Sequence, residues 1–160
     1  MKPAAGPADM SRRDVIRMSE AEIEAFLAEP GHTLQLATIN ADGTPHLVAM
    51  SYCLQDARIV LWSYAKAQKV VNLRRDPRLT VLVESGQRYE ELRGVQIGGI
   101  AVLVEDAETV RRIGERITEF AGGGEVAMGA VPKMAAKRVA ILVKPERVIS
   151  WDHSKLLGAY

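Results

Sequence analysis

The sequence contains a single cysteine, Cys53, in 160 residues. An intramolecular disulfide framework is therefore excluded, and a reducing environment is expected. Basic residues number 21 and acidic residues 20, so the chain as a whole lacks the positive field typical of nucleic-acid binders. No apolar run reaches the roughly 18 residues of a membrane-spanning helix, and the opening segment lacks the apolar core of a signal peptide. We expect a cytoplasmic protein with no membrane or nucleic-acid partner.

Motifs of several common enzyme classes are also absent. The chain has no Gly-x-Gly-x-x-Gly segment and no Walker A loop, which excludes the usual cradles for dinucleotides and nucleoside triphosphates. A Gly-x-Ser-x-Gly nucleophile elbow is missing. The histidines His32, His46 and His153 lack the spacing of zinc ligands, so no metal site is expected. Cys53 ends a predicted strand with no base nearby and is interpreted as a packing residue.

The residues that are present indicate one folded domain. Hydrophobic residues make up 48% of the chain and charged residues 26%, as is usual for globular proteins. The length is sufficient for one domain with a substantial core. We expect a flexible tail over residues 1–13, which are rich in Ala, Pro and Gly, and a single domain over residues 14–160.

Short strand-like segments dominate the rest of the chain. They cover residues 33–39, 46–53, 58–63, 79–84, 95–104 and 138–143, and the last can continue to residue 150. Asp42-Gly43 predicts a hairpin turn, and Gly98-Gly99 predicts a bulge or a close backbone approach. Six strands with short turns and no βαβα alternation favour a closed or nearly closed antiparallel barrel.

Three helices are predicted beside these strands. Ser19 and Glu22 have the spacing of a capping box at the start of the first, which ends before Pro30. The second covers residues 69–75. The third covers residues 107–120, where apolar residues repeat at helical spacing. The three glycines at 122–124 then predict a break and a mobile loop.

The segment 61–78 carries the clearest chemical signal. A strand ends at Trp62-Ser63, a turn holds Lys66, and a helix begins near Lys69, with Asn72 on the same helix face. One hydroxyl, two ammonium groups and the free N–H groups of a helix start would converge there. Such a corner suits the phosphate group of a ligand. The alternative is a solvated basic helix, because runs of charge usually lie on the surface.

Four pieces of the sequence resemble the pyridoxamine-phosphate-oxidase-like split β-barrel family. They are Gly43-Thr44-Pro45-His46, the stretch Lys69-x-x-Asn72-Leu73 followed by Asp76-Pro77-Arg78, Arg93-Gly94-Val95, and the closing Trp151-Asp152-His153-x-Lys155-Leu156. The resemblance extends over residues 19–160. It implies a mainly β fold with flanking helices, a split antiparallel β-barrel, and a homodimer that binds FMN or the deazaflavin F420 at its interface.

The resemblance also implies which residues hold the cofactor. They are Val48, Ala49 and Met50 along the flat ring, Trp62 near the ring or phosphate arm, and Ser63, Lys66, Lys69 and Asn72 around the phosphate. Residues 151–155 are a candidate to approach the site from the second subunit. No residue stands out as a catalytic acid or base; Tyr52, Tyr64, Tyr89 and His153 are conceivable proton donors.

Two departures from the family pattern favour one branch. The FMN-using pyridoxamine phosphate oxidases carry arginines where this chain has Val48 and Gln68, and these guanidinium groups bind phosphate. The pattern here resembles the F420-dependent reductases, and Lys66, Arg74 and Arg75 could meet the acidic tail of F420. We expect hydride transfer to a small conjugated substrate. The alternatives are an FMN flavoprotein on the same fold, or a module that holds a flavin, deazaflavin or haem without turnover.

Overall fold

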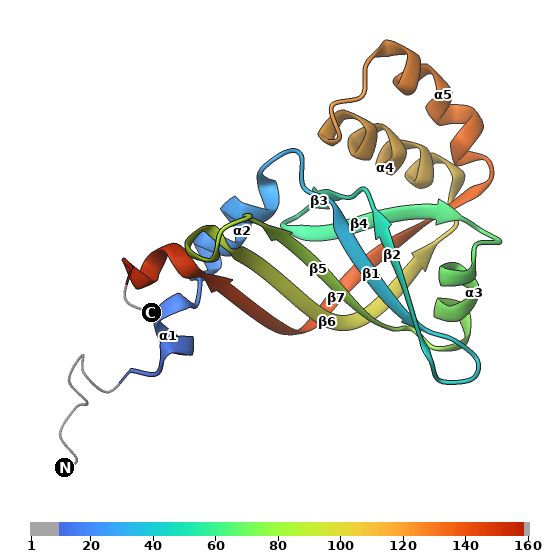
Figure 1. The fold of residues 1–160 in the computed structure, drawn as a ribbon. Coiled ribbons are helices and arrows are strands. Elements are labelled where there is room, and N and C mark those ends of the chain that lie inside the picture. Colours follow the sequence, from blue (N-terminus) through green and yellow to red (C-terminus); the bar gives the residue numbers. More distant parts are fainter. Residues whose placement is uncertain (1–9, 159–160) are drawn as a thin grey trace.

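One antiparallel sheet of seven strands forms the framework of the protein (Figure 1). The computed structural model describes residues 10–158. The sheet order is β2-β1-β5-β6-β7-β4-β3, and Figure 1 shows the sheet curling into a half-barrel. The strands are β1 (Leu34–Ile39), β2 (Pro45–Met50), β3 (Cys53–Gln55), β4 (Arg58–Tyr64), β5 (Arg78–Ser85), β6 (Arg93–Val104) and β7 (Arg138–Asp152). The predicted mainly β, split-barrel fold is confirmed.

Five α-helices within residues 10–158 flank the sheet. They are α1 (Arg12–Ile16), α2 (Glu20–Ala28), α3 (Gln68–Arg75), α4 (Ala107–Phe120) and α5 (Glu125–Ala135). The predicted capping box opens α2: the Ser19 hydroxyl accepts from the Glu22 N–H at 3.2 Å, and the Ser19 N–H donates to the Glu22 carboxylate at 2.6 Å. Figure 1 shows α4 and α5 together over one outer face of the sheet. No helix in the described part of the chain is long and apolar enough to cross a membrane.

Two hydrophobic clusters hold these layers together. The first fills the concave side of the sheet, where β1 alternates buried and half-buried residues as a strand with one face inward should. The second lies between α4, α5 and the outer face of β4 and β7, and includes Val60, Trp62 and Ile113. Because β4 contributes to both clusters, its five central residues are all buried.

The structure corrects the prediction of one strand over residues 46–53. The chain ends β2 at Met50 and begins β3 at Cys53, because β2 pairs with β1 and β3 pairs with β4 on the opposite side of the sheet. Tyr52 anchors the change of direction: its side chain is 1% exposed, and its hydroxyl donates to the Leu27 carbonyl at 2.8 Å.

Two further predictions were wrong in part. Residues 125–135 form α5 rather than a mobile loop, and buried Val131 and Ala135 pack it into the second cluster. Of the predicted tail, residues 1–9 lie outside the described residues, whereas Arg12 and Arg13 belong to α1, which Ser11 caps.

The bulge predicted at the glycine pair of β6 lies on the facing strand, β7, where Glu146 is left out of the pairing. Gly98 pairs with Arg147 and Gly99 with Pro145, so the register shifts between the two glycines. A Cβ atom on Gly99 would lie 2.1 Å from the Lys144 carbonyl oxygen, a contact that only backbone movement could relieve. A Cβ atom on Gly98 would meet nothing nearer than the Thr80 hydroxyl at 3.9 Å.

We therefore expect Gly99→Ala to lower the free energy of unfolding by about 1–3 kcal/mol, the usual cost of forcing extra volume into a packed site. Gly98→Ala is the matched control and should change stability by much less. Urea unfolding followed by far-UV circular dichroism measures both. Equal midpoints for the two variants would contradict the close approach at Gly99.

Candidate functional site

A hollow of about 520 Å³ lies where the outer helices meet the end of β2 and the open edge of β4. β3 pairs only with the first part of β4, up to Val60, so Leu61–Tyr64 have no neighbour on that side. Residues 49–51 approach this free edge from β2, and the α4–α5 connection closes the hollow through Ala121, Gly122 and Gly123. The small side chains of this connection leave room beneath it.

The structure brings five of the eight predicted site residues to this hollow. They are Ala49, Met50, Trp62, Ser63 and Lys69. The other three do not line it. Val48 is half-buried and packs against the first cluster, and Lys66 is exposed.

Asn72 is the third predicted residue outside the hollow. It is fully buried, and its amide nitrogen donates to the Thr38 hydroxyl at 3.1 Å and to the Asn40 side chain at 3.0 Å. Its amide oxygen accepts from Gln68 at 2.8 Å. The side chain thus joins α3 to β1 and the following turn. It shapes the site by fixing the helix that carries Lys69.

Lys69 and Ser63 meet as the sequence predicts. The Lys69 ammonium donates to the Ser63 hydroxyl at 3.3 Å. Burial lowers the pKa of Lys69, and the positive charge of Arg138 lowers it further. The ammonium is therefore held in an environment that disfavours its charge. An anion placed beside it would remove that penalty.

Arg138 is a site residue that the sequence reading missed. It opens β7, pairs with Tyr64 of β4, and lines the hollow. Its guanidinium carbon lies 4.4 Å from the ring centre of Trp62 and 4.3 Å from that of Tyr64, which is within the range of cation–π attraction. Its Nε atom is buried and has no hydrogen-bond partner. The only local signal was an arginine at the start of a predicted strand; its neighbours come from strand pairing.

Trp62 is held in place by a glycine of α4. A Cβ atom on Gly114 would lie 2.3 Å from the Trp62 ring, so the ring lies directly against the helix backbone. The ring is 6% exposed and still lines the hollow. Because residue 114 is a glycine, the Trp62 ring can pack in the second hydrophobic cluster and still line the hollow.

The other cations of segment 61–78 point elsewhere. Arg74 forms an ion pair with Glu105 at 2.5 Å, and Arg75 donates to the Ile39 carbonyl. Arg78 pairs with Asp76, whose pKa falls to about 2 because of this contact. None of the three arginines lines the hollow.

The four candidate proton donors differ in their position relative to the hollow. Tyr52 is bonded to the Leu27 carbonyl, and burial raises its pKa to about 12. The rings of Tyr89 and His153 are in tilted contact, with centres 4.5 Å apart, and neither residue lines the hollow. Tyr64 does line it and is 49% exposed. Of the four candidates, Tyr64 is the one placed to donate a proton there.

Neither metal binding nor a reactive thiol is supported by the described residues. No group of three or more His, Cys, Asp or Glu side chains within residues 10–158 could hold a metal ion. Cys53 is buried, which raises the pKa of its thiol to about 11 and keeps it protonated at neutral pH.

The sequence profile of the pyridoxamine 5'-phosphate oxidase family matches residues 19–152. The chain belongs to this family. No protein of curated function matches the chain. Members of the family bind flavin-type cofactors and include oxidoreductases.

Solved structures show the same fold. The conserved hypothetical protein Rv2991 from Mycobacterium tuberculosis is 44% identical, with a TM-score of 0.84 and 92% of each chain covered. An F420 reductase is 24% identical, with a TM-score of 0.64, covering 78% of this chain and 94% of the other. The haem storage protein HutZ from Vibrio cholerae is 18% identical, with a TM-score of 0.64, covering 84% and 97%. The last two likenesses show the fold alone.

We expect Arg138→Gln to raise the pKa of Lys69 toward its ordinary value, because one of the two causes of its lowering disappears. Carbon-13 NMR of the lysine side chains, followed against pH, measures this. An unchanged Lys69 titration would contradict the electrostatic contact between the two cations.

Proposed function

We propose that this protein is an oxidoreductase that uses F420, with the phosphate of the cofactor held between Lys69 and Arg138. The observation that carries the proposal is a pair of cations in an apolar-walled hollow that none of the described aspartates and glutamates lines. Two positive charges without a counter-charge favour an anionic ligand strongly. The buried and unpartnered Nε of Arg138 is a donor that such a ligand could satisfy.

The walls fit the rest of a flavin-like molecule. Met50, Trp62, Ile117 and Met134 line the hollow with apolar surface, and its volume of about 520 Å³ is within the usual range for ligand sites. The Ala49 backbone lies beside them on an edge strand, where it can exchange hydrogen bonds with a ring. A deazaflavin or flavin bound here supplies hydride-transfer chemistry.

Two features favour F420 over FMN. The positions that carry phosphate-binding arginines in the FMN oxidases hold Val48 and Gln68, so the charge must come from elsewhere, and Arg138 provides it. The Arg138 end is open to solvent through half-exposed Tyr64, and exposed Lys66 follows it in the chain. An acidic tail that continues beyond the phosphate can leave the hollow in this direction.

The chain's own residues have separate tasks in this proposal. Lys69 and Arg138 bind and orient the phosphate, Ser63 fixes the Lys69 ammonium, and the apolar walls exclude water from a small conjugated substrate. Tyr64 is placed to hold a proton at its hydroxyl. FMN as cofactor, and a flavin, deazaflavin or haem module without turnover, are the competing functions that the binding and turnover tests separate.

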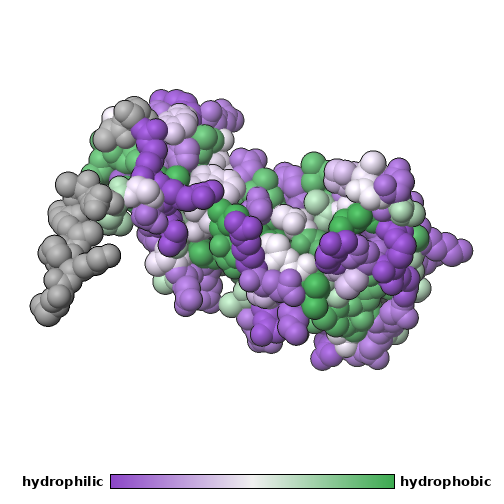
Figure 2. Space-filling view, turned by 90° about the horizontal axis from the view of Figure 1, so that it is seen from below, coloured by the Kyte–Doolittle hydropathy of each residue, from purple (hydrophilic) through white to green (hydrophobic). Residues whose placement is uncertain are grey.

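A homodimer stays a prediction. The described surface exposes several large apolar side chains, including Leu47 at 67% and Val102 at 46%. Figure 2 shows green apolar patches between purple hydrophilic residues on one face of the molecule. Two-fold pairing is the commonest way to bury such surface. Location in the cytoplasm is likewise still an expectation.

We expect Lys69→Ala and Arg138→Gln each to weaken F420 binding by about 1.5–3 kcal/mol, roughly ten- to hundredfold, because each removes a charge-assisted contact to phosphate. Fluorescence titration with F420 and, separately, with FMN measures the affinities. Arg74→Gln is the control, since Arg74 pairs with Glu105 outside the hollow.

Three outcomes would count against the proposal. If Lys69→Ala bound F420 as tightly as the natural protein does, Lys69 would not hold the phosphate. Tight binding of FMN alone would move the protein to the flavin branch of the family. Tight F420 binding without reduction of any enone or quinone acceptor by the reduced cofactor would favour a carrier or sensor.

A further inference from the structure

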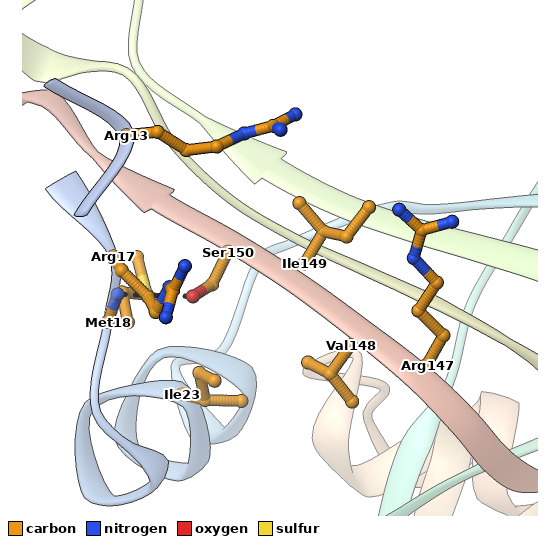
Figure 3. Close-up of a pocket in the computed structure, with 8 residues that line it drawn as sticks. All are labelled: Arg13, Arg17, Met18, Ile23, Arg147, Val148, Ile149 and Ser150. Carbon is orange, nitrogen blue, oxygen red and sulfur yellow. Dashed lines mark hydrogen bonds between the residues drawn. The ribbon is translucent and has the colours of Figure 1, made fainter. Parts of the chain in front are cut away.

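A second hollow, of about 350 Å³, lies between α1 and the last part of β7 (Figure 3). β4 pairs with β7 only up to Leu142, so beyond this point the second edge of β7 has no strand beside it. The α1 segment lies against this part of β7. The hollow shares no lining residue with the Lys69 hollow. It is therefore a separate site.

Three arginines line this second hollow, and none of the aspartates and glutamates within residues 10–158 does. The arginines are Arg13, Arg17 and Arg147. Arg17, which follows the end of α1, has one carboxylate partner, Asp14 of α1, at 3.1 Å. Within residues 10–158, Arg13 and Arg147 have no ion pair. Figure 3 shows Arg13 extending from α1 and Arg147 from β7 toward the space beside Ile149.

The wall that carries these arginines is fixed by hydrogen bonds. The Met18 N–H donates to the Ser150 hydroxyl at 3.1 Å, which ties the chain after α1 to β7. The Lys155 ammonium donates to the Arg17 carbonyl at 2.8 Å and to Glu22 at 2.7 Å. On the other wall, the bulge opposite Gly98 and Gly99 lies directly before Arg147. Bulges commonly redirect the side chain that follows them.

Apart from Ser150, the rest of the lining consists of apolar side chains. Met18 is 5% exposed and forms part of the floor, and Ile23, Val148 and Ile149 complete it. A free inorganic ion would contact the arginines and leave this apolar surface exposed to water. A ligand with an anionic head and an apolar body would use both. At roughly 30 Å³ for each water-sized group, the hollow has room for about a dozen non-hydrogen atoms.

We propose that the hollow formed by Arg13, Arg17 and Arg147 is a binding site for a small amphiphilic anion, a carboxylate on a short apolar chain. The guanidinium groups hold the carboxylate, and Ile23, Val148 and Ile149 cover the chain. The site is independent of F420 or any other cofactor, since no residue is common to the two hollows.

Octanoate is the probe, and two-dimensional NMR of the full-length protein is the measurement. We expect the resonances of Val148 and Ile149 to shift on titration. Arg13→Gln and Arg147→Gln should each weaken binding about three- to tenfold, as expected for partly exposed charge contacts that include guanidinium forks. Arg12→Gln is the matched control: it removes the same charge from the same helix but not from the lining.

Two further probes separate the contribution of the ligand's carboxylate from that of its apolar chain. Acetate, which keeps the carboxylate, and octanol, which keeps the chain, should each bind at least tenfold more weakly than octanoate. If acetate bound as tightly as octanoate, the apolar chain would contribute nothing to binding. The proposal of an amphiphilic ligand would then be overturned, because charge alone would explain the binding. Octanoate binding that is absent, or equal in the Arg12, Arg13 and Arg147 variants, would overturn the site.

The result is distinguishable from a failure of the proposed cofactor function. Lys69→Ala should leave octanoate binding unchanged, because Lys69 lines the other hollow. Loss of octanoate binding in this variant would contradict the separation of the two sites. F420 binding should in turn be unchanged in Arg147→Gln.

Discussion

Packing on both faces of β4 is the constraint on which the site depends. One face of the strand points into the barrel core and the other lies under α4 and α5, so the strand cannot move without disturbing both clusters. Its edge beyond β3 has no strand beside it but is supported by packing on both faces. Trp62 and Ser63 are presented from that edge on opposite faces of the strand, and the hollow forms around them. The fold thus makes a cleft by leaving a well-supported edge unpaired.

The second feature of the site is a pair of positively charged side chains, Lys69 and Arg138, that lie near each other. Lys69 comes from α3 and Arg138 from β7, and each is positioned by contacts that do not neutralise it: a hydroxyl for Lys69, two aromatic rings for Arg138. Neighbouring arginines of α3 are neutralised by Glu105 or capped by a carbonyl. The chain therefore leaves positive charge uncompensated at the hollow while compensating it on the surrounding helix. This selectivity is what distinguishes a binding site from a basic surface.

The sequence predicted an element correctly where the spacing of its apolar residues matched the face that the structure buries. The helix over residues 107–120 has the predicted bounds because its apolar residues repeat toward the second cluster. α5 was missed because three glycines precede it and Pro132 lies inside it; burial of Val131 and Ala135 outweighs these signals. Arg138 was missed because strand pairing, which no local pattern encodes, sets it beside Tyr64. Trp62, Ser63 and Lys69 did reach the hollow, since the strand-turn-helix order of 61–78 is local. Ala49 and Met50 reached it from β2, as the family resemblance implies.

The most direct test of the account compares two ligands and two proteins by isothermal titration calorimetry. One ligand is F420, and the other is its riboside, which lacks the phosphate and the acidic tail. The two proteins are the natural chain and Lys69→Ala. If Lys69 binds the phosphate, its loss should weaken F420 about ten- to hundredfold and leave the riboside nearly unchanged. Equal weakening of both ligands would contradict the account, because Lys69 would then act on the ring or on the fold.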